Sequence, residues 1–192
     1  MKLNVCQMRK LIYVINLSID GCFDHTIGTP AEDLFDFYIN LVRNAGMLVY
    51  GRTTYELMVP YWPDIAKNPE GQTKADVDYA EAFDAVEKVV FSKSLDKAEG
   101  KNSRIVRTKA EDEIRKLKQE EGKNILVGGV SIPSQLIELG LVDEYRFVIG
   151  PIVAGEGRRL LEGVSLRESL QLRLVESKIF KSGCVALRYL KQ

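Results

Sequence analysis

The segment MLVYGRTTYE, residues 47 to 56, places a glycine, an arginine and two threonines directly after a short apolar run. The apolar run predicts a strand that ends at Gly51, and Arg52 to Thr54 then form the first turn of a helix. Free backbone N–H groups and the helix dipole at such a junction favour an anion, and the guanidinium of Arg52 can bind two phosphate oxygens. The alternative is that Thr53 caps the helix and Arg52 is solvated.

Two further predicted strand ends carry residues of the same kind. In VVFSKS, Ser92 and Lys93 follow an apolar run, where a hydroxyl and an ammonium can bind a phosphate or a ribose. In NILVGGVSI, Gly128 and Gly129 separate a strand from a helix, and adjacent glycines let a backbone approach a pyrophosphate closely. Each segment alone is compatible with an ordinary turn. Three such junctions in one chain favour a dinucleotide, which needs contacts from several neighbouring strands.

Segments of strand and helical character alternate along the chain. The expected strands are residues 10–19, 47–51, 88–92, 103–107, 124–129, 141–153, 170–180 and 184–190; the expected helices are 31–44, 53–58, 76–86, 110–122 and 131–140. Residues 60–76, with three of the six prolines, are expected to form a surface excursion.

This alternation predicts a single α/β domain over residues 1–192, with three α/β/α layers and a mixed, mainly parallel sheet. The last two strands, joined by KSG, predict an antiparallel C-terminal hairpin. In such sheets ligands bind at the carboxyl ends of the strands.

The composition excludes several classes of function. Twenty-seven basic residues balance 27 acidic ones, so no overall charge attracts nucleic acid or an anionic membrane. No apolar stretch is long enough to span a bilayer. The three cysteines lack metal-ligand spacing and are odd in number, which argues against a zinc site and a disulfide framework and favours the cytoplasm. A Rossmann G-x-G-x-x-G after the first strand and a Walker motif are both missing.

Taken together and in this order, the motifs resemble those of the dihydrofolate reductase superfamily. GRTTYE resembles its Gly-Arg-x-Thr-aromatic-Glu motif, VVFSKS its second cofactor strand, and ILVGG its glycine pair. LSIDG, LVDEYRF and GPIVAGEGRRLL are similar to the branch that includes the C-terminal reductase domain of the bifunctional riboflavin biosynthesis deaminase-reductase. The resemblance covers about residues 9–190 and implies a dihydrofolate reductase-like fold.

The resemblance also implies an activity: NADPH-dependent hydride transfer to a pterin-, pyrimidine- or flavin-related small molecule. The reaction would be most like that of the 5-amino-6-(5-phosphoribosylamino)uracil reductase or of a dihydrofolate reductase. The implied cofactor contacts are Gly51, Arg52, Thr53 and Thr54 at phosphates, Ser92 and Lys93 near the adenosine 2′-phosphate, Gly128, Gly129, Val130 and Ser131 around the pyrophosphate, and Ser18 and Ile19 beside the nicotinamide.

Two carboxylates are the candidate catalytic groups that the resemblance implies. Asp20 would face the substrate, and Asp33 occupies a position like that of the active-site carboxylate of dihydrofolate reductases, where it could relay a proton. The alternative for Asp33 is a helix N-terminal charge that the dipole stabilises. The loop between Asp20 and Pro30 lacks the tryptophan expected in folate-reducing enzymes.

Other residues have both a functional and a structural interpretation. A deaminase half would need His-x-Glu and Pro-Cys-x-x-Cys, and His25 is the single histidine, so deamination is excluded. Trp62 either covers the cleft or anchors its loop. Arg158 and Arg159 either bind a substrate phosphate or lie in a solvated turn.

Two alternatives to a reductase remain. One is a non-catalytic nucleotide-binding protein of the same fold, which binds the cofactor without turnover. The other is a dimeric scaffold in which the strand YRFVIGPIVAG, residues 145–155, pairs across subunits. A homodimer is expected. Nucleic acid and membrane are not expected as partners, and no bound metal is expected.

Overall fold

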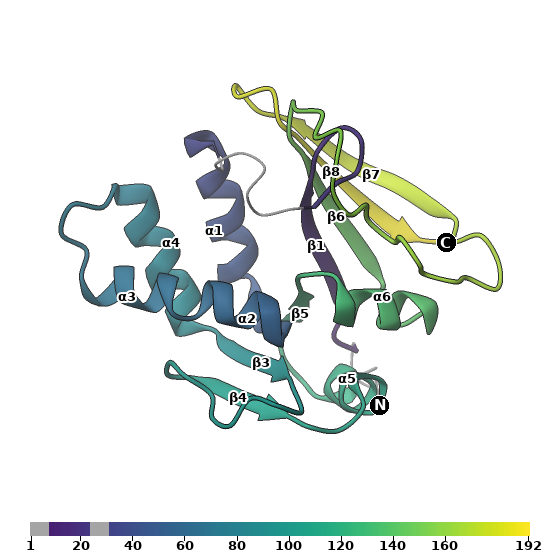
Figure 1. The fold of residues 1–192 in the computed structure, drawn as a ribbon, viewed down its shortest axis with the longest axis horizontal. Helices are drawn as coiled ribbons and strands as arrows, with labels where there is room; N and C mark the ends of the chain where they lie inside the picture. The colour runs from purple at the N-terminus through teal and green to yellow at the C-terminus, as the bar shows by residue number, and fades with distance from the viewer. Residues whose placement is uncertain (1–7, 24–30) are drawn as a thin grey trace, which may run out of the picture.

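The computed structural model describes residues 8–23 and 31–192. The elements follow the chain in this order (Figure 1): β1 (Leu11–Leu17), a 3-10 turn (Glu32–Leu34), α1 (Phe35–Arg43), β2 (Ala45–Gly51), α2 (Arg52–Met58), α3 (Tyr61–Lys67), α4 (Lys74–Ala85), β3 (Glu87–Phe91), β4 (Ser103–Val106), α5 (Ala110–Gln119), β5 (Asn124–Val127), α6 (Ser131–Glu138), β6 (Glu144–Ile149), β7 (Leu172–Ile179) and β8 (Val185–Lys191).

The eight strands form one sheet in the order β4-β3-β2-β5-β1-β6-β8-β7. Strands β4 to β6 along this order are parallel, and β8 runs antiparallel to its neighbours β6 and β7. The turn between β7 and β8 contains Gly183 at a φ of 85°, a conformation that glycine adopts without strain. The predicted mixed, mainly parallel sheet with an antiparallel C-terminal hairpin is therefore confirmed.

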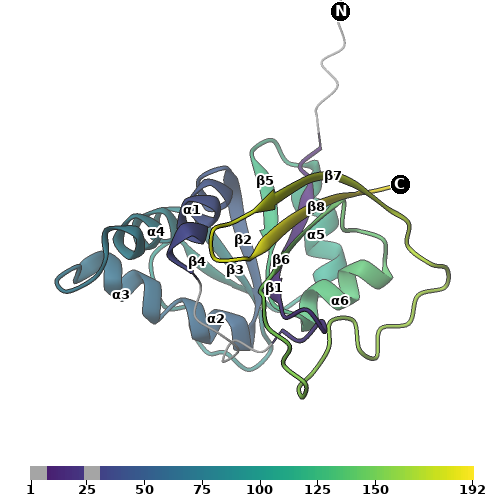
Figure 2. The same ribbon diagram turned by 90° about the horizontal axis from the view of Figure 1, so that it is seen from above.

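Helices cover both faces of the sheet, which makes three layers. Alternate side chains of β1 point to opposite faces, so that Leu11 and Tyr13 join the core under α5 and α6 while Ile12 joins the core under α1, α2 and α4. Figure 2 shows α1, α3 and α4 on one side of the strands and α5 and α6 on the other. Burial on both faces explains why the parallel strands are almost continuously apolar.

Two sequence-based expectations need correction. Residues 60–76 are not an irregular excursion, because α3 occupies Tyr61–Lys67 and α4 begins at Lys74, after a capping box between Thr73 and Asp76. Strand β6 cannot pair across subunits, because β1 and β8 occupy both of its edges. The scaffold hypothesis loses the strand on which it was based.

Candidate functional site

Strand β5 ends before its two neighbours, so the carboxyl edge of the sheet has a step. The last pair between β5 and β2 is Val127 with Val49, and β2 continues for two more residues. The last pair between β5 and β1 is Val127 with Tyr13, and β1 continues for four more residues, to Leu17. At about 3.3 Å per residue, β5 is recessed by about 7 Å on one side and about 13 Å on the other.

The chain reverses sides at this step. The connection after β2 packs on the face that carries α2 and α4, whereas the connection after β5 leads to α6 on the opposite face. Such a switch point at the carboxyl edge of a parallel sheet is the usual position of a ligand in open α/β folds. The Gly51, Phe91–Ser92 and Gly128 junctions converge at this edge, since Gly51 pairs with Phe91 and the amide of Gly128 donates to the carbonyl of Val49 at 3.0 Å.

Glycines allow the first turns of α2 and α6 to pack against each other. Gly129 has a φ of 83°, and a Cβ there would lie 2.3 Å from Oγ1 of Thr54. A Cβ on Gly51 would lie 3.0 Å from Oγ of Ser131. The carbonyl of Gly129 accepts a hydrogen bond from the hydroxyl of Tyr13 at 3.0 Å. Both glycines are therefore required by the close approach of backbone to side chain, and Gly129 also by its left-handed conformation.

Four consecutive amides at the start of α6 have no acceptor in the part of the chain that the structure describes. Among the residues that the structure describes, the N–H groups of Gly129 to Ile132 make no hydrogen bond, and no side chain caps the helix at Val130. These donors lie at the positive end of the helix dipole, next to the recessed end of β5. Their geometry suits an anion with several oxygens, such as a pyrophosphate.

Arg52 stands at the neighbouring junction with its side chain 47% exposed. Its Nε donates to Glu56 at 2.8 Å, and its Nη1 donates to Oγ of Ser94 at 2.7 Å. The guanidinium thus links α2 to the loop after β3 and stays accessible to solvent. No side chain caps α2, so the expected capping role of Thr53 is not observed.

The loop after β3 is held from within and from β4. Ser92 is buried, and its Oγ accepts from the amides of Ser94 (3.3 Å) and Leu95 (3.0 Å). Arg107, which follows β4, donates to the carbonyls of Lys93 (3.0 Å) and Leu95 (2.7 Å). Sequence reasoning missed Arg107, although a basic residue directly after a strand was the signal used elsewhere in the chain. Lys93 itself is exposed beside Arg107.

Asp20 and Ser18 form a compact turn after β1. Ser18 is buried and donates from its hydroxyl to Oδ1 of Asp20 at 2.7 Å. The backbone amides of Ala154 and Gly155 donate to the same carboxylate at 2.9 and 3.0 Å. These hydrogen bonds, that of Ala154 above all, lower the pKa of Asp20 to about 2. The side chain of Ile19 is 63% exposed at this edge.

Asp33 lies against the turn between β7 and β8. Its Oδ2 accepts from the amide of Ser182 at 2.9 Å, and this hydrogen bond lowers the pKa of Asp33 below its ordinary value. Its Oδ1 is buried and has no donor among residues 8–23 and 31–192. The carboxylate is therefore ionised at neutral pH in this conformation, so it could accept a proton but holds none to donate, and its role as a proton relay stays a prediction. His25 lies outside the described residues.

Comparison with known proteins identifies the family of this chain. Residues 9–186 match the family model described as the RibD C-terminal domain. The chain belongs to the RibD C-terminal domain family. The match spans strands β1 to β7 completely and the first two residues of β8.

Relatives of this RibD C-terminal domain protein include YyaP, an uncharacterized protein of Bacillus subtilis (strain 168), at 28% identity over 97% of each chain. The structure resembles that of a diaminohydroxyphosphoribosylaminopyrimidine deaminase/5-amino-6-(5-phosphoribosylamino)uracil reductase from Thermotoga maritima, with a TM-score of 0.67 and 13% identity over 96% of this chain and 57% of the other. It also resembles dihydrofolate reductase from Enterococcus faecalis complexed with NADP(H), with a TM-score of 0.59 and 14% identity over 95% and 96%. These likenesses establish a dihydrofolate reductase-like fold.

Two other residues that the sequence analysis of this RibD C-terminal domain singled out, Trp62 and Arg158, contact aromatic rings. Trp62 packs in α3 against Tyr61 and Tyr79, with ring centroids 4.9 and 4.5 Å away, as an anchor would. The guanidinium of Arg158 lies 5.1 Å from the ring centroid of Phe23. Within the described residues, no helix combines the length and the apolar character that crossing a bilayer requires.

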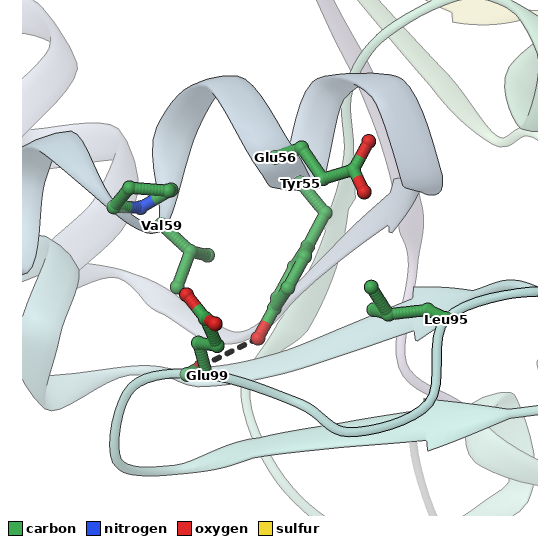
Figure 3. A pocket seen from close by; sticks show the side chains of 6 residues that line it. Tyr55, Glu56, Val59, Leu95 and Glu99 are labelled. Carbon is green, nitrogen blue, oxygen red and sulfur yellow. Dashed lines mark hydrogen bonds between the residues drawn. The ribbon is translucent and has the colours of Figure 1, made fainter.

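A small cavity of about 160 Å³ lies between α2 and the loop after β3 (Figure 3). The side chain of Tyr55 lines it, and the hydroxyl of Tyr55 donates to the carbonyl of Glu99. Its other lining residues are Glu56, Val59, Pro60 and Leu95. Sites for small organic ligands measure roughly 300–1,000 Å³, so this cavity is too small for a dinucleotide.

Proposed function

We propose that this protein is an NADPH-dependent reductase that transfers hydride to a pterin-, pyrimidine- or flavin-related substrate. Membership in a family of reductase type supports an oxidoreductase. The observation that carries the proposal is the set of four amides from Gly129 to Ile132, which have no acceptor within residues 8–23 and 31–192 and lie beside the recessed end of β5. When bound, NADPH would supply a hydride from C4 of its nicotinamide ring.

The residues present fit the phosphates of this cofactor. A Cβ at Gly129 would fill the space beside Thr54, and the amides that follow would donate to pyrophosphate oxygens. Thr53 and Thr54 in the first turn of α2 and Val130 and Ser131 at the start of α6 would hold the same group, as proposed contacts. Ser18 and Ile19 would border the nicotinamide, although the hydroxyl of Ser18 is already bonded within its turn.

Cations at the far end of the proposed site favour NADPH over NADH. Arg52 at the start of α2 and Lys93 in the loop after β3 are both exposed, and Ser94 of the same loop is hydrogen bonded to Arg52. A 2′-phosphate would find a permanent charge and an ammonium there, whereas the 2′-hydroxyl of NADH gains little from either.

The two carboxylates enter the proposal as anions. Since the pKa values of Asp20 and Asp33 lie below their ordinary range, neither holds a proton at neutral pH. We therefore assign to this chain the positioning of cofactor and substrate and the exclusion of water, and to neither carboxylate the role of a proton donor at neutral pH.

Titration of the protein with NADPH and with NADH, followed by cofactor fluorescence, tests the cofactor. We expect NADPH to bind at least tenfold more tightly. The absence of binding at millimolar NADPH would refute the proposal. Steady oxidation of NADPH with one of a panel of aminopyrimidine ribosyl phosphates, dihydropteridines or flavins would then define the substrate.

Gly129→Ala tests the four amides of Gly129 to Ile132, here called the amide cradle. The substitution puts a Cβ against Thr54 and strains a left-handed backbone, so we expect NADPH affinity to fall by tenfold or more. Gly71→Ala is the matched control, because Gly71 has a φ of 80° but open space around its Cβ position, in the turn between α3 and α4. Equal losses of affinity in both variants would show that backbone strain, and not the cradle, is responsible.

A second candidate function is nucleotide binding without turnover. The engagement of both candidate carboxylates in structural hydrogen bonds favours it. Tight NADPH binding with no oxidation across the whole substrate panel would support this function, and oxidation with any member would refute it.

A further inference from the structure

The chain segment between β6 and β7 is long and mostly irregular, yet its first part is tied to the end of β1. The amide of Ile19 donates to the carbonyl of Ile152 at 2.8 Å, and the amide of Leu160 donates to the carbonyl of Gly21 at 2.9 Å. Cys22 and Arg159 form an isolated antiparallel bridge. Residues 150–161 therefore wrap around the turn that follows β1.

The carboxylate of Asp20 is at the centre of these contacts. Its Oδ1 accepts from the amide of Ala154 and its Oδ2 from the amide of Gly155. Arg159 donates from Nε to the carbonyl of Asp20 at 3.2 Å, and its Nη2 lies 3.7 Å from Oδ2. Two successive amides on one carboxylate form a charge-assisted pair of hydrogen bonds, which are shorter and stronger than neutral ones.

The same contacts bring apolar side chains to the surface at the carboxyl edge. Ile19, Ile152 and Val153 are 63%, 42% and 65% exposed. The hydrogen bond between the backbones of Ile19 and Ile152 joins the two segments that carry these side chains, next to the end of β1.

We propose that Asp20 is a positioning residue: its carboxylate anchors residues 150–161 to the end of β1 and so fixes the apolar surface formed by Ile19, Ile152 and Val153. The anchoring is independent of the proposed function. Its consequence for catalysis, that this surface is where the planar ring of the second substrate packs, depends on the reductase proposal.

Asp20→Asn tests the anchor. Asparagine keeps the size of the side chain but loses the charge, and its amide group would face an N–H donor. In the protein without cofactor we expect hydrogen exchange of the Ala154 and Gly155 amides to accelerate at least tenfold. Trypsin cleavage after Arg158 and Arg159, both exposed, should accelerate in parallel.

Asp143→Asn is the matched control. Asp143 lies near the other end of β1, where its carboxylate accepts from the amide of Leu11 at 2.8 Å and pairs with Lys118 at 2.6 Å. The control loses a comparable carboxylate without touching residues 150–161, so exchange at Ala154 and Gly155 should stay as in the wild type. Unchanged exchange at both amides in Asp20→Asn would overturn the proposal.

A weaker variant keeps the test decisive if Asp20→Asn does not fold. Arg159→Met removes the guanidinium and leaves both amide hydrogen bonds of the carboxylate, so we expect it to loosen residues 150–161 only a few-fold. If Arg159→Met accelerated hydrogen exchange at Ala154 and Gly155 to the rate of unprotected amides, the guanidinium and not the carboxylate of Asp20 would be the anchor. That result would contradict the proposal.

Activity separates positioning from catalysis. We expect Asp20→Asn to raise KM for the second substrate about tenfold, with kcat within a few-fold of wild type and a smaller change in NADPH affinity, because Ile19 alone of the three apolar residues would border the nicotinamide. A fall in kcat of a hundredfold or more with wild-type amide protection would instead make Asp20 a catalytic residue. Failure of NADPH to bind any variant would refute the reductase proposal and leave the exchange result standing.

Discussion

Lys88 is a charged residue without solvent contact. Its side chain in β3 is fully buried, and its ammonium donates to the carbonyls of Phe83 (2.9 Å) and Asp84 (3.0 Å) at the end of α4. Burial lowers the pKa of this ammonium from 10.5 to about 8. Between these two values the unfolded chain binds a proton that the folded chain has lost, so the contribution of Lys88 to the free energy of unfolding rises with pH.

We expect the stability of the wild type relative to Lys88→Met to increase by about 1–2 kcal/mol between pH 7.5 and pH 10, at roughly 1.4 kcal/mol per pKa unit. Urea denaturation at both pH values measures it. Lys101→Met is the control, because Lys101 is exposed and pairs with Asp84 at the same helix end, 2.6 Å away. If the stability of the wild type rose equally with pH relative to Lys88→Met and relative to Lys101→Met, the rise could not be assigned to the burial of Lys88.

At the residue scale, the sequence predicts the types of the site residues better than their partners. Gly51, Arg52 and Gly129 lie at strand ends as predicted, because a strand followed by a helix is visible in local periodicity. The partners of Asp20 could not be predicted, since Ala154 and Gly155 lie about 135 residues further along the chain and are brought close only by the pairing of β1 with β6.

At the scale of elements, the loop after β3 depends on β4. Arg107 binds carbonyls of this loop, and Ser92 binds two of its amides, so the loop has a defined shape although it has no regular structure. The proposed 2′-phosphate contact of Lys93 requires that shape.

We expect Arg107→Met to lower NADPH affinity about tenfold and NADH affinity much less, since a charge-assisted hydrogen bond contributes about 1.5 kcal/mol. Exchange of the Ser94 and Leu95 amides should accelerate. Arg115→Met is the control, because Glu111 on the outer surface of α5 is the one ion-pair partner of Arg115 among the described residues. If the two variants bind NADPH equally well, the hydrogen bonds from Arg107 to the loop after β3 have no role in cofactor binding.

Element boundaries show what local pattern can and cannot reveal. Gly140 ends α6 as predicted: its φ is 66°, its amide donates to Ile137, and the amide of Leu141 donates to Leu136, which is a Schellman motif. Helix α3 was missed because its prolines suggest a loop, whereas Pro60 is its N-cap and Pro63 lies in its first turns, where no backbone donor is needed. The recess of β5 is a matter of register between strands far apart in sequence, which no local pattern encodes.

At the scale of the whole molecule, the two main cores share their strands. Val89 and Val90 are neighbours in β3 and belong to opposite cores, as do Val127 and Leu126 in β5. Neither core can lose its packing while the other keeps a complete sheet. We therefore propose that the chain folds as one domain.

We expect guanidinium unfolding curves from far-ultraviolet circular dichroism and from the fluorescence of Trp62, the single tryptophan, to coincide. Trp62 packs beside α4 on one face of the sheet, whereas circular dichroism averages over all layers. A fluorescence transition at lower denaturant would show that this side unfolds separately and would contradict a single cooperative unit.

A homodimer remains a proposal. Because β6 is interior, strand pairing between subunits would have to use β4 or β7, which end the sheet. Strand β7 carries exposed Leu174 and Ile179 alongside charged residues, and charged residues on an edge strand oppose unplanned pairing.

The order of the strands also determines at which point of synthesis the carboxyl edge of the sheet can be completed. Strands β1 and β2 are made first but are never neighbours, because β5 lies between them. A nascent chain that stops before residue 124 has an open seam at the middle of its future sheet, with two sets of strand hydrogen bonds unmade. In the proposed binding mode, the amides assigned to the pyrophosphate emerge directly after the strand that closes this seam. A shorter ribosome-bound intermediate would lack them and could not use cofactor binding to assist its folding.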